Sequence, residues 1–245
     1  MHFVEAKGIL SSNNGMNIYR GCTHGCIYCD SRSNCYGFTH EFEDIEVKAN
    51  APQLLEKALK SKRKKCMIGT GAMCDPYLQA EEKLKLTRRC LELIDKYEYG
   101  VAIQTKSTRI LRDMDILKSI NAKAKAVVQM TMTTYDETLC KILEPNVSTT
   151  HERFEALMQF KKAGIPTVVW LTPILPFIIC ITKISTFLIL CDLAVCLATL
   201  YVSFSLVFAL MRYLQGKVFL IRFYSPTTLS SSRAEFRLPS RLACA

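Results

Sequence analysis

Three cysteines close together are the feature of this sequence with the clearest chemistry. Cys22, Cys26 and Cys29 have the spacing C-x-x-x-C-x-x-C, and Gly21 and Gly25 lie beside the first two. Cysteine thiolates hold 4Fe–4S clusters, and glycines allow a tight loop in which several thiolates converge on one cube. A cube usually takes four protein ligands, and this loop supplies three. The spacing therefore predicts a cluster whose fourth iron is open to a small molecule, much as a catalytic zinc keeps one position free.

A single zinc ion is the alternative metal that the same thiols could bind. A zinc knuckle would use the three cysteines together with either His24 or Cys35. Zinc knuckles normally pair two C-x-x-C-like arms across a longer spacer, and the sequence shows no second arm. Three ordinary buried thiols are a further alternative, but such thiols have no reason to cluster. We therefore expect an iron–sulfur cluster.

Length and charge limit the class of protein. A chain of 245 residues can form one large α/β domain or two small ones. Its 12 cysteines, without a recognisable secretory signal in residues 1–10, argue against a disulfide framework and predict a cytoplasmic protein. The net charge of +10 allows a nucleic-acid or anionic partner. The densest basic run, residues 60–65, is more typical of a solvated helix end than of a DNA or RNA contact.

Apolar periodicity predicts alternating helices and strands that would position the loop. Helical spacing of apolar residues indicates helices over residues 51–65, 82–97, 113–120 and 151–163. Short apolar runs indicate buried strands over residues 66–71, 100–105, 126–133 and 167–175. Strands that alternate with helices in this rhythm predict βα units and a parallel sheet, an α/β fold.

Polar residues follow each of these predicted strands. They occupy residues 69–77, 104–107, 132–134 and 172–173. In parallel α/β sheets, ligands bind at the carboxyl ends of the strands. Simple turn chemistry explains any one of these segments, but four in succession favour a lined binding site.

Together with the cysteine loop, these segments resemble the radical S-adenosylmethionine (SAM) proteins, and within them the branch of spore photoproduct lyase. The residue before the third cysteine is commonly aromatic in that family, and here it is Tyr28. The other matching motifs are Asp75-Pro76-Tyr77 with Glu81, Thr105-Lys106-Ser107 with Arg112-Asp113, Thr133-Thr134 with Asp136-Glu137, Glu144-Pro145, Arg153 and residues 173–176. The resemblance covers about residues 17–177, and its motifs are specific in combination.

The resemblance implies a partial (β/α)6-type radical SAM barrel of about five βα units, with a 4Fe–4S cluster and SAM as cofactors. The segment after the second strand would contact the SAM amino group, through Gly71, Ala72, Met73 and Asp75. The ribose and carboxylate of SAM would face Thr105, Lys106, Ser107 and Thr133. Arg153 would pair either with the SAM carboxylate or with Glu144.

The resemblance also implies a reductive reaction. An electron from a donor such as flavodoxin or ferredoxin would enter the cluster and break the SAM sulfonium bond, and the resulting 5′-deoxyadenosyl radical would take a hydrogen atom from a substrate. Spore photoproduct lyase repairs a thymine lesion in DNA, so a DNA substrate for this chain would rest on analogy alone. No catalytic residue is assigned. Cys140 is a weak candidate for a radical relay, because a buried core thiol fits its position beside Leu139 and Ile142 better.

The chain changes character after Phe177, so we predict a core over residues 1–177 and an atypical tail over residues 178–245. Residues 187–211 are almost wholly apolar, with Asp192 as their only formal charge, and by length and hydropathy they predict a membrane span. The tail is then either a membrane anchor or a frameshifted sequence. We favour the second interpretation, because a core that ends before its sixth strand would expose a sheet edge.

Three hypotheses follow for function. The first is a radical SAM enzyme with an unknown substrate. The second is a truncated, inactive remnant that binds a cluster but cannot enclose SAM. The third is a zinc-stabilised nucleic-acid-binding module, which the basic charge and the clustered cysteines support.

Overall fold

A computed structural model of the protein describes residues 1–173 and 221–222. The predicted tail therefore lies almost wholly outside the described residues, and so does the predicted membrane span over residues 187–211. Within the described part of the chain, no helix is long and apolar enough to cross a membrane.

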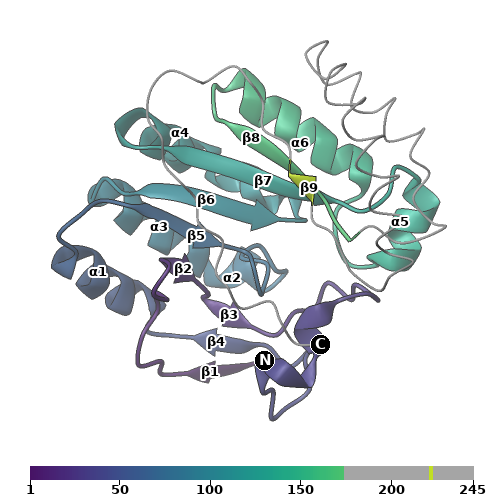
Figure 1. The fold of residues 1–245 in the computed structure, drawn as a ribbon, viewed down its shortest axis with the longest axis horizontal. Coiled ribbons are helices and arrows are strands. Elements are labelled where there is room, and N and C mark those ends of the chain that lie inside the picture. Colours follow the sequence, from purple (N-terminus) through teal and green to yellow (C-terminus); the bar gives the residue numbers. More distant parts are fainter. Residues whose placement is uncertain (174–220, 223–245) are drawn as a thin grey trace.

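A six-stranded sheet forms the centre of the molecule (Figure 1). Its strand order is β2 (Gly15–Met16), β5 (Met67–Thr70), β6 (Gly100–Thr105), β7 (Ala126–Met132), β8 (Thr167–Leu171) and β9 (Ile221–Arg222). The pairs from β2 to β8 are parallel, and β9 is antiparallel to β8. The parallel part confirms the α/β fold predicted from the alternating pattern. The carboxyl ends of these strands therefore lie at one edge of the sheet.

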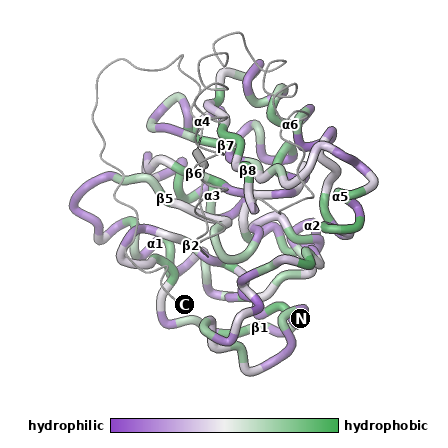
Figure 2. Tube along the Cα trace, turned by 45° about the vertical axis from the view of Figure 1, so that its right-hand side comes forward, coloured by the Kyte–Doolittle hydropathy of each residue, from purple (hydrophilic) through white to green (hydrophobic). Residues whose placement is uncertain are grey.

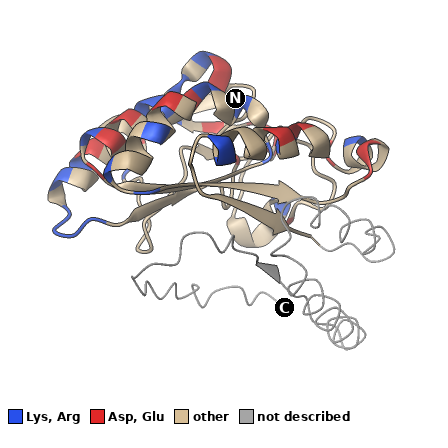
Figure 3. Ribbon diagram, turned by 90° about the horizontal axis from the view of Figure 1, so that it is seen from above, with Lys and Arg blue, Asp and Glu red and all other residues tan. Residues whose placement is uncertain are grey.

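The longer helices cover one face of this sheet and carry many charged residues, whereas the strands carry almost none (Figure 3). These helices are α1 (Ala51–Ser61), α3 (Leu86–Lys96), α4 (Met114–Lys123) and α6 (Thr150–Lys162). The core between them and the strands holds fully buried Leu91, Leu117 and Phe160 against Ile103 and Val128. The connection between α1 and β5 is hydrophilic in Figure 2, as expected for the solvated basic run that follows α1.

A second, three-stranded sheet lies beside the first and was not predicted from the sequence. Its order is β1 (His2–Val4), β4 (Glu46–Lys48) and β3 (Tyr19–Arg20), with β1 parallel and β3 antiparallel to β4. The short helical turns η1 (Asp30–Arg32) and η2 (Asn34–Tyr36) connect β3 to β4. This small sheet holds the chain on both sides of the cysteine loop.

The prediction of one helix over residues 82–97 is wrong. The chain forms α2 (Glu81–Leu84) and α3, and Lys85 between them has a left-handed backbone with φ of 50°. The cause is tertiary: the carboxylate of Glu81 is buried and accepts a hydrogen bond at 3.1 Å from the backbone N–H of Thr87. The carboxylate thereby caps a new helix start.

Two other element ends differ from the prediction. Helix α1 ends at Ser61 and not at residue 65, because Lys62 is extended and the basic residues that follow are solvated. Strand β8 ends at Leu171, and the cis bond between Thr172 and Pro173 follows it, whereas the strand was expected to continue to residue 175. The helix expected over residues 113–120 is η3 (Thr108–Asp113) followed by α4, and the helix expected over 151–163 is α6, capped by Thr149 and Glu152.

Candidate cofactor site

The loop that carries Cys22, Cys26 and Cys29 is held by segments from distant parts of the chain. At its start, the N–H of Cys22 donates to the carbonyl of Phe42 at 3.0 Å. In its middle, the N–H of Ile27 donates to the carbonyl of Leu143 at 3.0 Å. Gly21 has φ of 86°, and a β-carbon there would overlap the carbonyl oxygen of Phe42. These backbone contacts fix the path of the loop.

The three thiols on this loop differ in acidity. The pKa of Cys22 is lowered, chiefly because the thiol of Cys74 hydrogen-bonds to it; burial opposes this shift and His24 adds to it. Burial raises the pKa of Cys26 to about 11. Because the thiolate is the form that binds metals, the surroundings favour the metal-binding form at Cys22 and disfavour it at Cys26.

The donor set fits an iron–sulfur cluster better than one zinc ion. Some described His, Cys, Asp and Glu side chains have metal-ligating atoms within 4.8 Å of one another, close enough to share one ion. None of these three cysteines is among them. A single zinc ion needs its donors that close, whereas each thiolate of a cube binds a different iron and the thiolates stand farther apart. The alternative zinc ligands are also engaged or remote, since His24 Nδ1 faces Asp75 Oδ2 at 3.6 Å and Cys35 is exposed on η2.

Asp75 joins the carboxyl ends of β5 and β6 beside the loop. Its Oδ1 accepts a hydrogen bond from Thr105 Oγ1 at 2.7 Å, and its Oδ2 accepts one from the N–H of Lys106 at 2.7 Å. The N–H of Ser107 donates to Thr105 Oγ1 at 3.0 Å. Asp75, Thr105 and Ser107 were predicted to contact SAM, but all three are buried and bonded to one another. They hold the strand ends in place.

A second buried group holds the loop on its other side and is centred on Glu144. The hydroxyl of Tyr28 and the guanidinium of Arg153 both bond to the Glu144 carboxylate, and Thr133 Oγ1 donates to Glu144 Oε1 at 2.7 Å. Of the two partners considered for Arg153, the structure shows Glu144. Burial would raise the pKa of Glu144, but Arg153 and Lys106 outweigh burial and lower it.

Cys140 belongs to the surroundings of this group. It lies on α5 (Glu137–Leu143), is almost fully buried, and its Sγ is 3.8 Å from Arg153 Nη2. Burial raises the pKa of its thiol. These are the properties of a core thiol.

A smaller part of the predicted site faces outward. Gly71, Ala72 and Met73 follow β5 at the surface, and the side chain of Met73 is 39% exposed. The Nζ of Lys106 lies 5.7 Å from the ring centroid of Tyr28, beside the cysteine loop. An accessible backbone edge and one amino group therefore adjoin the three thiols.

Sequence reasoning did not single out Cys74. This buried thiol donates to the carbonyl of Gly21 at 2.7 Å and lies beside Cys22. The sequence feature that could have identified Cys74 was its position within the polar segment after β5. The motifs behind the family resemblance also meet in space, because Tyr77 bonds to Asp113 at 3.0 Å and Arg112 pairs with Glu81 at 2.9 Å.

The fold of parallel βα units, with three thiols on a loop beside it, defines an α/β protein, and comparison with known families defines the class further. A sequence model of the radical SAM superfamily matches residues 16–178, so the chain belongs to that superfamily.

Individual relatives and structures agree with this assignment. The chain is 33% identical over 166 residues to an uncharacterized protein of Methanocaldococcus jannaschii, a match that covers 67% of this chain and 61% of that protein. It is 26% identical over 174 residues to an uncharacterized protein of Mycobacterium tuberculosis, covering 66% and 49% respectively. The chain thus matches less than two thirds of the length of either relative.

A solved structure of spore photoproduct lyase complexed with dinucleoside spore photoproduct resembles the fold. The TM-score is 0.53 at 17% sequence identity, and the match covers 69% of this chain and 49% of the lyase. At this identity the likeness concerns the fold alone. It confirms the predicted resemblance to the spore photoproduct lyase branch at the level of architecture.

Proposed function

We propose that this chain is a radical SAM enzyme that holds a 4Fe–4S cluster through Cys22, Cys26 and Cys29 and cleaves SAM reductively. The observation that carries the proposal is the placement of three free thiols on one anchored loop, next to the accessible edge at residues 71–73. When bound, the cluster supplies the electron that splits SAM into methionine and a 5′-deoxyadenosyl radical. A small electron-transfer protein such as a flavodoxin or ferredoxin is the implied partner.

The predicted cofactor residues fall into two groups: those that contact SAM and those that hold the contacting residues in position. We assign Gly71, Ala72, Met73 and Lys106 to contact with SAM, because they are the predicted cofactor residues that reach the surface beside the loop. The remaining predicted residues position those contacts through hydrogen bonds, from a partly buried site for Tyr28 and from buried sites for the others: Asp75, Thr105, Ser107, Thr133 and Arg153. Residues 1–177 form the proposed cofactor-binding core. The proposal covers radical formation and assigns no substrate.

The test uses the full chain, reconstituted anaerobically with iron and sulfide and then given SAM and dithionite. We expect 5′-deoxyadenosine to accumulate with the parent protein and not with Cys22→Ala. Cys35→Ala is the matched control, because this thiol is exposed on η2 outside the loop, and it should keep the activity of the parent. The nucleoside is measured by chromatography.

Two results would contradict the proposal in different ways. A brown protein with cluster absorbance that forms no 5′-deoxyadenosine would indicate the truncated remnant. A protein that assembles no cluster, or a Cys22→Ala variant that cleaves SAM at the parental rate, would refute the assignment of the loop itself.

A further inference from the structure

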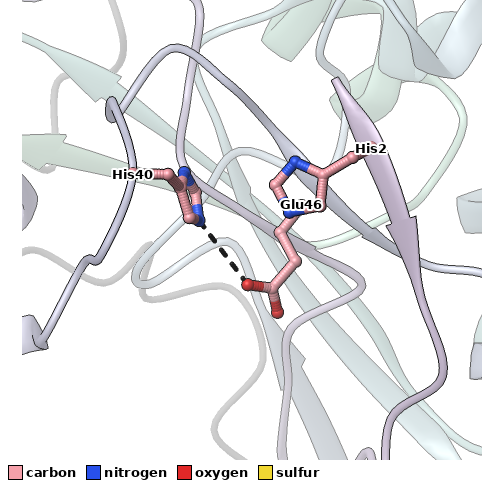
Figure 4. A group of neighbouring side chains, drawn as sticks. All are labelled: His2, His40 and Glu46. Atoms are coloured by element: carbon pink, nitrogen blue, oxygen red, sulfur yellow. Dashed lines mark ion pairs between the residues drawn. The ribbon is translucent and has the colours of Figure 1, made fainter.

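Two histidines and a glutamate form a compact group on the small sheet, separate from the cysteine loop (Figure 4). His2 lies on β1, Glu46 lies on β4, and His40 lies in the segment between η2 and β4. One ligand atom from each residue lies within 4.8 Å of the others. All three residues are partly buried.

The second ring nitrogen of each histidine is already engaged. His2 Nδ1 lies 2.9 Å from Asp44 Oδ2, and His40 Nδ1 lies 2.9 Å from the carbonyl oxygen of Glu41. A carboxylate and a carbonyl can only accept, so each Nδ1 carries the proton and donates it. In a neutral ring, Nε2 is then left as an acceptor on both histidines.

His40 Nε2 is buried and lacks a hydrogen-bond partner among the residues that the structure describes. It faces Glu46 Oε2 at 3.6 Å, as the dashed line in Figure 4 shows. Two acceptors that face each other across this distance repel unless a hydrogen-bond donor or a cation lies with them. A proton on His40, a bridging water or a cation shared with His2 would each meet this need.

We propose that His2 Nε2, His40 Nε2 and the Glu46 carboxylate bind a divalent cation of the zinc type. Metal-binding histidines typically donate their other N–H to a carboxylate or a backbone carbonyl, and both histidines do so here. Two imidazoles and one carboxylate form a ligand set that zinc commonly uses, with the fourth position left to water. The bound cation would also satisfy the buried Nε2 of His40.

Arg20 is a positive group beside Glu46, and its contacts are defined. Its Nη1 lies 3.7 Å from Glu46 Oε2, which is longer than a hydrogen bond. Its Nη2 donates to the carbonyls of Tyr36 and Gly37 at 2.6 and 2.9 Å. These carbonyls hold the guanidinium in place, so that Arg20 forms direct hydrogen bonds with the backbone of η2 and Gly37 and a longer ion pair with Glu46.

The site would join three segments of the chain, two of which are strands of only three residues. These pieces are β1, β4 and the segment that runs from η2 into β4. The same segment includes Phe42, whose carbonyl accepts the N–H of Cys22. A cation at this place therefore stabilises the small sheet and the start of the cysteine loop.

The test measures zinc in the cluster-loaded full chain, after treatment with EDTA and equilibration with Zn²⁺. We expect about one zinc per chain by elemental analysis, and K-edge absorption spectroscopy should show nitrogen and oxygen ligands at about 2.0–2.1 Å. His40→Gln and Glu46→Gln should each lose this zinc. His151→Gln is the matched control, because His151 is an exposed histidine on α6, and it should keep the zinc.

Several outcomes would overturn the proposal. These are a parent protein without zinc, equal zinc in all variants, or sulfur ligands at about 2.3 Å, which would place the ion on cysteines. Far-UV circular dichroism and the cluster absorbance check that the variants are folded. His2→Gln provides a further variant at a side chain that is 41% exposed, so that loss of zinc can be separated from loss of folding. The readout does not depend on cleavage of SAM.

Discussion

Replacing Arg153 with methionine is expected to lower the free energy of unfolding by about 3–5 kcal/mol, as in other proteins where one partner of a buried ion pair is removed. Arg153 and Glu144 are both fully inaccessible to solvent. Without the guanidinium, the Glu144 carboxylate is left buried with the hydroxyls of Tyr28 and Thr133 and the weak thiol donor of Cys140. The carbonyl of Thr131 also loses its donor. Urea denaturation followed by circular dichroism measures the change.

A matched control and a second variant make this prediction specific. Arg63→Met makes the same chemical change at an exposed position after α1 and should leave stability unchanged. The double variant Arg153→Met/Glu144→Gln should be more stable than Arg153→Met alone, because it removes the unpaired charge. If Arg153→Met were as stable as Arg63→Met, the ion pair would not be what holds this side of the loop.

Replacing Gly71 with alanine is expected to damage both the fold and the cofactor site. Gly71 has φ of 95°, where side chains are strained by about 1–3 kcal/mol. A β-carbon there would overlap the carbonyl oxygen of Gln104 and lie 2.7 Å from its carbonyl carbon. Since Gln104 belongs to β6, the clash can be relieved only if the two strand ends move apart. The unfolding midpoint and the formation of 5′-deoxyadenosine should both fall.

Gly69, two residues earlier and within β5, supplies the control for this variant. A β-carbon at Gly69 meets nothing within 4 Å, so Gly69→Ala should keep a midpoint close to that of the parent. The informative quantity is the difference between the two alanine variants in thermal denaturation. Equal midpoints would show that the approach of residue 71 to β6 is looser than the structure indicates.

Much of the central sheet could be predicted because its strands are short apolar runs between helices, although burial alternates between full and partial along β5 and most of β6. Strand β6 has the predicted bounds, Gly100–Thr105, and β7 ends one residue earlier than expected. A continuous apolar run of this kind reflects burial, which the sequence records directly. The three-stranded sheet has no such apolar pattern in the sequence, because its strands have only two or three residues.

The helix break at Lys85 was unpredictable for a different reason. Amphipathic spacing continues through residues 82–97, so local pattern favours one helix. The break depends on the buried carboxylate of Glu81, which bonds to Tyr19 and pairs with Arg112. Those partners are far away in the sequence, and only the folded chain brings them to Glu81.

The candidate site was also predictable only where its signals are local in the sequence. Three thiols on a glycine-containing loop and polar residues after each strand are local signals, and they were found from the sequence. Whether Thr105 faces a ligand or Asp75 is set by the packing of two strand ends, which a sequence pattern does not contain. The group of His2, His40 and Glu46 has no recurrent metal-binding spacing, so its members come together only through the register of β1 and β4.

The hydrogen bonds that hold the cysteine loop also bear on the order of events during synthesis. Tyr28 and Glu144 are 116 residues apart, and Thr23 and Asn146 are 123 apart. A growing chain therefore contains all three thiols long before it contains the residues that anchor them. Because contacts between such distant residues form only once the intervening strands have assembled, the loop reaches its final path late in folding. If the loop binds a cluster as we propose, iron and sulfide would reach the ordered loop only after synthesis of the chain, and the three thiols of a partly made chain would lack these anchoring contacts.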